Sequence, residues 1–378
     1  MTMSLFLTIF LTLYTGLHYY LYGKIVGALA PGAPGKALLG VIFIFMIIAP
    51  VLVRLAERQE LDLLARLLAY TGYIWMGVAF LCFSLSLLVD LYRLLLWGLS
   101  PWLDISALRP SRRTAFFLPG LLSLLIGLYG FYAALQIKTE THTLLTEKLP
   151  PGADRLRIAF ISDLHLGVIV GEDRVKRVLR VLGEAKPDLL ISLGDLVDGQ
   201  LNHVEGSIAL LAKYQPPLGK YAVPGNHEYF VGLPYALALT QEAGFTLLRG
   251  EAVTVGGRVN LAGADDPTAH RFGLALPAEE KTILTGLPRD RFTLLLKHQP
   301  LVEEASLGLF DLQVSGHTHR GQVFPFYLLT RLVFPYPTGF FRLEQGSSLY
   351  TSRGTGTWGP PIRFLAPPEV TVIDLARP

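Results

Sequence analysis

The first 136 residues contain four long apolar runs, and these runs limit what the chain can fold into more than any other feature. They are nearly free of charge and cover Leu5–Leu21, Ala37–Val53, Leu67–Val89 and Ala115–Leu135. A helix needs about 20 mainly apolar residues to cross a bilayer. Only 17% of the 378 residues are charged, whereas soluble proteins carry roughly a quarter. We therefore expect an all-α transmembrane region of about four helices over residues 1–136, followed by a soluble domain.

Four spans would place both ends of the chain on the same side of the membrane. Basic residues are equally numerous on the two sides, but their densest cluster, Arg109–Arg113, lies between the third and fourth runs. Because loops rich in Lys and Arg stay in the cytoplasm, this cluster favours an extracytoplasmic soluble domain on a cell-membrane (inner-membrane) protein. The alternative is that the runs are core helices of a large soluble domain, but four such runs exceed what a soluble core needs.

Charge and cysteine content exclude several classes of function. The net charge is +3, which is too small to indicate nucleic acid as a main partner. The single cysteine, Cys82, lies inside an apolar run. It rules out an intramolecular disulfide and a thiolate-rich zinc site.

Beyond the apolar runs, residues 137–155 are polar and contain Pro150-Pro151-Gly152, so we expect a linker there. We expect the soluble domain over residues 156–378. It contains short β-rich segments that end at polar side chains: Leu156–Ser162, Asp188–Leu193, Lys220–Val223, Thr293–Leu296 and Asp311–Val314. In layered α/β folds the loops at the carboxyl ends of strands converge on one site.

The polar residues at these strand ends are the ligand types that suit a pair of divalent first-row metals. The candidates are Asp163, His165, Asp195, Asn226, His298, His317 and His319. We expect Asp195 to bridge the two ions. The other ligands divide into one set of Asp163, His165 and His319 and a second set of Asn226, His298 and His317.

A metal pair about 3.5–4 Å apart clamps the attacking and leaving oxygens during displacement at phosphorus. It also lowers the pKa of a bridging hydroxide toward neutrality, so this group can attack the phosphorus. His227 directly follows Asn226 and would project over the substrate. There it could donate a proton to the leaving oxygen. We therefore expect His227 and Asp195 to act in catalysis.

Four further residues are candidates for support or substrate binding. Asp198 and Glu228 lie beside the ligands and are expected to hydrogen-bond them rather than to bind metal. Arg320 follows the last histidine and is either a phosphate contact or an ordinary surface residue. Arg353 stands among glycines, which would let its loop approach a ligand.

These motifs resemble the full series of the calcineurin-like metallophosphoesterases, and the tail from Arg353 to Val370 is similar to the membrane-associated bacterial subgroup. The resemblance rests on the motifs Asp163-x-His165, Gly194-Asp195-x-x-Asp198, Gly225-Asn226-His227-Glu228, His298 and Gly316-His317-x-His319. The resemblance implies a four-layer α/β/β/α sandwich with two mixed sheets and a pair of Mn, Fe or Zn ions. One departure is Arg320, where that subgroup usually has glycine, so the substrate range is open.

An apolar, aromatic stretch follows the last metal histidine and extends from Val323 to Phe341. It is either a packed structural loop or an apolar flap that touches the bilayer or holds acyl chains. If the stretch is such a flap, it favours a lipid-linked phosphodiester or pyrophosphate as the substrate. Some relatives in the subgroup hydrolyse UDP-2,3-diacylglucosamine, although its cytosolic uridine end disagrees with the orientation that the arginines indicate.

Two other classes of function stay open. The domain could bind a phosphoester as a catalytically silent sensor or scaffold, but a decayed site would usually have lost a ligand. It could instead regulate a membrane transporter formed by the spans, which have no conspicuous intramembrane charge pairs. The favoured hypothesis is a membrane-anchored dimetal phosphoesterase.

Overall fold

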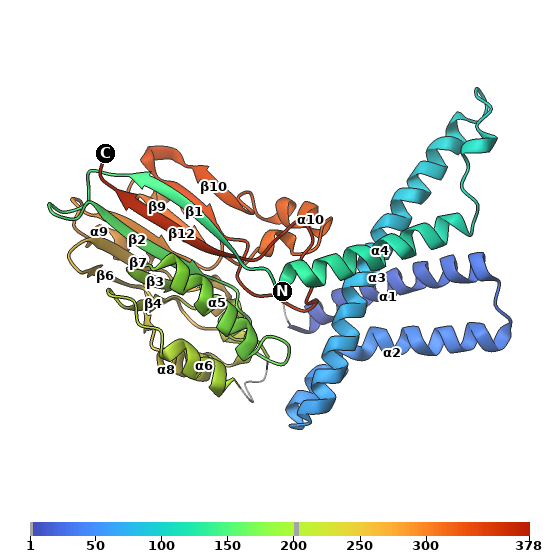
Figure 1. Cartoon of the computed structure of the whole chain (residues 1–378), viewed down its shortest axis with the longest axis horizontal. Helices are drawn as coiled ribbons and strands as arrows, with labels where there is room; N and C mark the ends of the chain where they lie inside the picture. The colour runs from blue at the N-terminus through green and yellow to red at the C-terminus, as the bar shows by residue number, and fades with distance from the viewer. Residues whose placement is uncertain (1–2, 200–203) are drawn as a thin grey trace. The chain divides into compact units, whose positions relative to one another are not determined.

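The structure is a computed structural model that describes residues 3–199 and 204–378. It divides into two compact units (Figure 1). The first contains the described residues up to Tyr132 together with Gly359–Phe364. The second contains Ala133–Trp358 and Leu365–Pro378.

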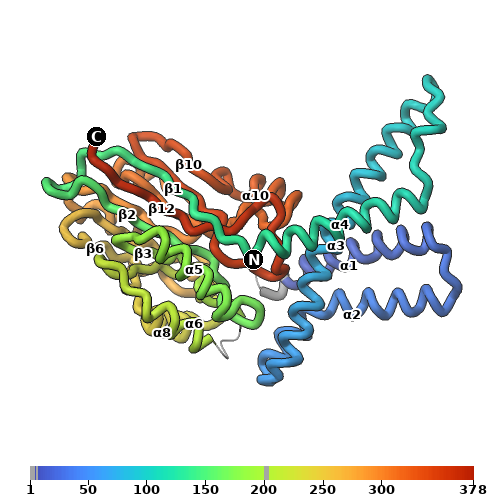
Figure 2. Tube along the Cα trace, viewed as in Figure 1, coloured from blue at the N-terminus to red at the C-terminus, as the bar shows by residue number. Residues whose placement is uncertain are grey.

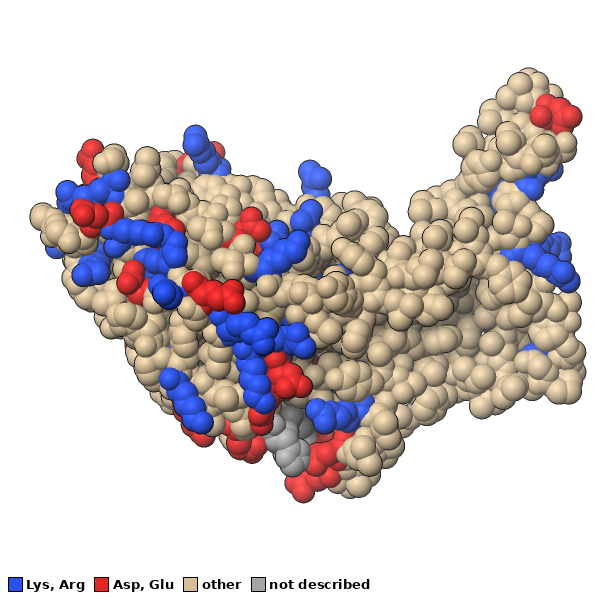
Figure 3. All heavy atoms as spheres, in the orientation of Figure 1, with Lys and Arg blue, Asp and Glu red and all other residues tan. Residues whose placement is uncertain are grey.

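The first unit is built from four helices at the positions of the four apolar runs. They are α1 (Met3–Leu29), α2 (Ala33–Arg58), α3 (Asp62–Leu99) and α4 (Thr114–Ala134). Among the described residues, α2, α3 and α4 are long and apolar enough to span a membrane. The four helices expected from the apolar runs are therefore present, and α1 carries His18, Tyr20 and Lys24 in its second half. In Figure 3 charged side chains gather over the second unit, whereas the sides of the helices are largely uncharged.

A short segment near the C-terminus, Gly359–Phe364, packs within the helical unit. A Cβ atom at Gly130 of α4 would lie 2.5 Å from the Ile362 side chain, and one at Gly77 of α3 would lie 2.8 Å from it. The backbone N–H of Arg363 donates to the Gly130 carbonyl at 2.9 Å. Two helix glycines therefore make the space that this segment fills, which the sequence analysis did not foresee.

The second unit is a sandwich of two six-stranded mixed sheets. The strands of the first sheet follow the order β1 (Lys138–Leu145), β12 (Glu369–Ala376), β2 (Arg155–Ile161), β3 (Leu189–Ser192), β4 (Lys220–Ala222) and β5 (Thr246–Leu247). Those of the second follow the order β10 (Gly339–Arg342), β11 (Ser348–Thr351), β9 (Leu312–Ser315), β8 (Phe292–Leu296), β7 (Val259–Gly263) and β6 (Glu251–Val255). Figure 2 shows β12, in red, beside the green β1.

Alternating side chains give the sandwich its layers, since successive residues of a strand point to opposite faces. On β2, Ile158 and Phe160 belong to the core between the sheets, whereas Ala159 and Ile161 belong to the core beneath the helices. Those helices are α5 (Glu172–Ala185), α6 (Glu205–Ala212) and α8 (Leu233–Glu242). On the outer side of the second sheet, Leu295 of β8 packs with Leu284 of α9 (Glu280–Thr285). The predicted four-layer α/β/β/α fold is confirmed.

The segment expected to be a linker contains a strand of the first sheet. Within residues 137–155, β1 pairs in parallel with β12 along its whole length, from Lys138 beside Glu369 to Leu145 beside Ala376. The prediction of a linker was wrong here because β1 is an edge strand with one face toward water. Its alternating Thr residues look polar in sequence, yet they favour a half-buried strand.

The strands that precede the candidate ligands run parallel within each sheet. β2, β3 and β4 are adjacent in the first sheet, and β8 and β9 are adjacent in the second. Their carboxyl ends therefore lie along one edge of each sheet, which positions the loops that follow.

Candidate metal centre

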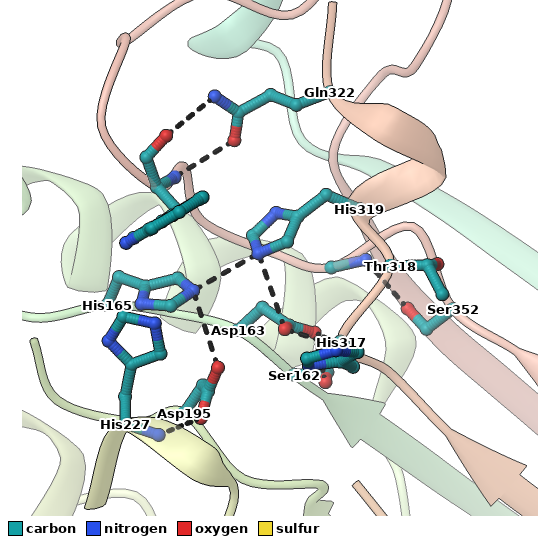
Figure 4. A network of polar contacts seen from close by, with 12 residues as sticks. Ser162, Asp163, His165, Asp195, His227, His317, Thr318, His319, Gln322 and Ser352 are labelled. Carbon is teal, nitrogen blue, oxygen red and sulfur yellow. Dashed lines mark hydrogen bonds and ion pairs between the residues drawn. The ribbon is translucent and has the colours of Figure 1, made fainter. Parts of the chain in front are cut away.

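The seven predicted ligands come together at the carboxyl ends of the two sheets. Figure 4 shows five of them, Asp163, His165, Asp195, His317 and His319. In one group, ligand atoms of Asp163, His165 and His319 all lie within 4.8 Å of one another. In another group, the same holds for Asp195, His298 and His317. All these residues are buried except His317, which is partly buried.

The first group has the spacing of ligands around one ion. Nε2 of His319 lies 3.1 Å from Nε2 of His165 and 3.4 Å from Oδ1 of Asp163. Metal bonds of roughly 2.1 Å place neighbouring ligand atoms about 3.0–3.4 Å apart. The three side chains therefore fit a divalent cation.

The second group converges on Nε2 of His298. This atom lies 3.0 Å from Oδ1 of Asn226, 3.2 Å from Nδ1 of His317 and 3.1 Å from Oδ2 of Asp195. The same Asp195 oxygen lies 3.8 Å from Nε2 of His165 in the first group. Asp195 thus stands between the two groups, in the place that a shared ligand requires.

Sequence comparison places these residues in a known family. The model of the calcineurin-like phosphoesterase family matches residues 156–321, which include every predicted ligand. A metallophosphoesterase of Aquifex aeolicus is 40% identical over 255 residues, which cover 67% of this chain and 97% of that protein. The chain belongs to the calcineurin-like phosphoesterases.

Further relatives carry the same domain, and one of them is described as a transmembrane protein. A bovine protein described as a transmembrane protein with a metallophosphoesterase domain is 30% identical over 331 residues, covering 82% of this chain and 73% of the bovine one. The metallophosphoesterase YkuE of Bacillus subtilis is 34% identical, over 66% of this chain and 90% of that one. This calcineurin-like phosphoesterase is a membrane-associated, metal-dependent phosphoester hydrolase whose family binds a dinuclear metal site.

Hydrogen bonds from the backbone hold the phosphoesterase ligands in place. His298 donates from Nδ1 to the Leu193 carbonyl at 2.8 Å, which turns its Nε2 toward the centre. Asp163 accepts from the backbone N–H of His317 at 3.0 Å and from the hydroxyl of Ser162. His298 and Asp163 are therefore each oriented by hydrogen bonds in addition to their contacts with the other ligands.

Glu228 fixes two loops at once. Its carboxylate accepts from the backbone N–H groups of Asp195 at 3.0 Å, Leu196 at 2.8 Å and Gly225 at 2.7 Å. Burial, and then the nearby Asp195 charge, raise the pKa of Glu228 to about 6. The side chain therefore joins the loops after β3 and β4.

Backbone strain is concentrated at the ligands. Five of the seven have left-handed φ angles between 49° and 70°: Asp163, His165, Asp195, His317 and His319. Such conformations cost about 1–3 kcal/mol each for non-glycine residues and cluster at functional sites. Close packing adds a second constraint, because a Cβ atom at Gly225 would lie 2.3 Å from Oδ1 of Asp195.

Two of the histidines are held in the form that binds metal. Burial, and then the positive charge of neighbouring histidines, lower the pKa of His165 and of His317 to about 3. Their imidazoles are therefore neutral at pH 7. Only the neutral ring has a free lone pair for a cation.

His227 lies beside the ligands at the start of α7 (Asn226–Val231). Its backbone N–H donates to Oδ1 of Asp195 at 2.8 Å, and its ring Nδ1 contacts Oδ1 of Asp198 at 2.9 Å. Burial alone would lower the pKa of His227, but Asp195 and Asp198 outweigh it and raise the pKa to about 9. The ring is thus oriented by Asp198 and carries a proton at neutral pH.

The two candidate arginines occupy different surroundings. Arg320 has a left-handed φ of 52°, and its guanidinium lies over the Tyr327 ring, 5.8 Å from the centroid. The guanidinium of Arg353 pairs with Glu369 at 2.5 Å and Glu140 at 2.7 Å, at the edge of the first sheet. These contacts give Arg353 a structural role in joining β1 to β12.

The structure also brings aromatic residues to the site that the sequence analysis missed. The ring of Trp358 lies 5.8 Å from that of His227. The Gln322 side chain donates a hydrogen bond to the Trp358 carbonyl and accepts one from the Trp358 backbone N–H. Phe230 lies 5.6 Å from His227 and 6.0 Å from Phe272. The only signal in the sequence was the adjacency of Trp358 to the glycine-rich segment at 354–356, which does not identify an aromatic rim.

We expect the two ligand groups to lose metal differently when mutated. Asp195→Asn should reduce the bound metal to less than one ion per chain, because this carboxylate contacts both groups, whereas His319→Ala should retain about one. Metal analysis of the full-length protein after chelation and reloading with Mn²⁺ measures this. Asp173→Asn, on the exposed face of α5, is the matched control. An Asp195→Asn protein that kept both ions would contradict the assignment.

Proposed function

We propose that this phosphoesterase hydrolyses a phosphodiester or pyrophosphate bond in a lipid-linked substrate. The observation that carries the proposal is an aromatic rim around a charge-dense centre. Phe230 and Trp358 lie against His227, and Phe334 lies 5.1 Å from His317 of the second ligand group. Apolar surface beside both ligand groups suits a phosphorus atom that carries two organic groups.

The proposed roles follow from the two ligand groups. Asp163, His165 and His319 would hold one ion, Asn226, His298 and His317 the other, and Asp195 would touch both. When bound, the pair supplies an activated water and neutralises charge on the phosphoryl oxygens. The chain's own contribution is to fix seven ligands on strained, closely packed loops.

His227 is the proposed proton donor to the leaving oxygen. Its Nδ1 is engaged by Asp198, so the second ring nitrogen is the one that can act on substrate. Trp358 and Phe230 lie against the same ring and would shield the proton transfer from water.

The test of the proposed activity is metal-dependent turnover by the full-length protein in detergent–lipid micelles. After chelation and reloading with Mn²⁺ or Zn²⁺, we expect hydrolysis of an aryl phosphodiester and of UDP-2,3-diacylglucosamine to exceed that of an aryl phosphomonoester. Asp195→Asn should abolish each activity. No turnover with two ions bound would contradict the proposal and favour a sensor that binds a phosphoester without cleaving it.

The role of His227 predicts a dependence on the leaving group. His227→Gln should lower kcat about 10²–10⁴-fold for an alkyl phosphodiester, whose alkoxide needs a proton. The loss should be much smaller for a nitrophenyl diester, whose anion leaves unprotonated. Metal content serves as the control and should equal that of the wild-type protein. Equal losses for both leaving groups, or loss of an ion, would instead make His227 a metal ligand.

We further propose that the catalytic unit lies on the extracytoplasmic side. α4 begins next to the exposed Arg112 and Arg113 and ends at Ala134, where the catalytic unit starts. If α4 spans the membrane, the arginines and the catalytic unit lie on opposite sides, however many other helices cross it. The positive-inside rule then supports this orientation.

Reporter fusions test this orientation. Alkaline phosphatase fused after Pro378 should be active and green fluorescent protein at the same point dark, and fusions after Pro110 should give the reverse pattern. The opposite result would place the catalytic unit in the cytoplasm and favour UDP-2,3-diacylglucosamine. The expected result favours a lipid phosphoester displayed on the outer face.

A further inference from the structure

We propose that α10 (Phe326–Val333) lies in the membrane interface and buries an exposed leucine-rich face among lipid acyl chains. This surface is distinct from the metal centre. The inference concerns where the catalytic unit contacts lipid and does not depend on which substrate it cleaves.

The helix exposes its apolar side chains and buries a polar one, whereas an ordinary surface helix does the opposite. Its large apolar side chains point outward, with Leu332 exposed by 82% and Val333 by 69%. Phe324, Phe326, Leu328 and Leu329 on and beside the helix are also exposed. In contrast, Thr330 is buried, and its hydroxyl donates to the Phe326 carbonyl at 3.3 Å. A soluble helix turns its apolar stripe inward, so this arrangement needs an apolar partner outside the unit.

A bilayer is the partner that the chain itself supplies. Two points of the catalytic unit are joined to the helical unit by short connections. Only three residues separate the end of α4 at Ala134 from β1 at Lys138, and Gly359–Phe364 is part of the helical unit. Since three residues span roughly 10 Å when extended, the catalytic unit is held close to the membrane that α2, α3 and α4 could cross.

The composition of the exposed face fits an interfacial helix. Arg331 is exposed within the leucine-rich segment and can reach anionic headgroups, while leucine, valine and phenylalanine side chains enter the acyl region. Leu365, which follows the Gly359–Phe364 segment directly, is also exposed. The free side of α10 therefore has both the apolar area and the cationic group that interfacial binding uses.

Contacts within the catalytic unit connect α10 to the metal centre. The helix follows η4 (His319–Gly321), which carries a predicted ligand, and the Arg320 guanidinium covers Tyr327. Phe334, at the end of α10, lies against the His317 ring. Insertion of this face would hold the rim of the site at the level of the headgroups.

The test measures the depth of spin labels in the full-length protein, reconstituted in nanodiscs of phosphatidylcholine with a minor share of phosphatidylglycerol. Nitroxides are attached at Leu332→Cys or Val333→Cys in a Cys82→Ser background. The matched control is Leu145→Cys, an exposed leucine (68%) at the far end of β1. Unchanged metal content of each labelled protein shows that the catalytic unit is folded.

We expect the labels on α10 to collide with oxygen, which concentrates in the acyl region, and to be protected from a water-soluble nickel chelate. Their oxygen-to-nickel accessibility ratio should exceed that of the Leu145→Cys label by about tenfold. A ratio equal to the control would overturn the proposal. So would protection from both reagents, which would show that protein, either the helical unit or a second copy, covers α10.

Discussion

The carboxylate of Asp195 is the group on which the rest of the site depends. One of its oxygens lies within reach of imidazoles from both ligand groups, His165 and His298. The other accepts the backbone N–H of His227, and the Asp195 backbone N–H donates to Glu228. A buried carboxylate beside a second one, Asp163, is costly unless positive charge and hydrogen-bond donors surround it. A metal pair held by these residues would supply the charge, and loops from both sheets supply the donors.

The centre is assembled across the sandwich rather than on one sheet. The first sheet contributes Asp163, His165, Asp195 and Asn226, whereas the second contributes His298, His317 and His319. The distances between ligands therefore depend on the core between the sheets, where Phe160 of β2 and Leu294 of β8 belong to one buried cluster. Because protein interiors are close-packed, a change of volume there would alter the spacing of the side chains that could hold metal. The geometry of the candidate metal centre thus depends on the packing between the two sheets.

The residues of the candidate metal centre could largely be predicted from the sequence, whereas fewer of the residues around it could. Short β-rich segments ending in Asp, Asn or His predicted that these seven side chains lie close together, because strand ends of parallel sheets converge by geometry alone. The edge strand β1 was missed because an edge needs polar residues on its open face, so its pattern resembles a linker. The positions of Trp358 and Ile362 depend on contacts between residues far apart in the chain. Trp358 lies against His227, and Ile362 packs against Gly77 and Gly130. No local pattern encodes such contacts.

The segment Gly359–Phe364 makes the two units interlaced rather than consecutive. The chain leaves the helices at Ala134, builds nearly the whole sandwich, returns to α3 and α4 for six residues, and then completes the first sheet with β12. The last strand, which pairs with both β1 and β2, therefore lies beyond the return passage. No single cut separates a catalytic unit from a membrane anchor, because any fragment that keeps β12 also keeps Ile362 without the glycine-lined space that receives it. In this architecture the anchor is a structural part of the phosphoesterase and not an appendage to it.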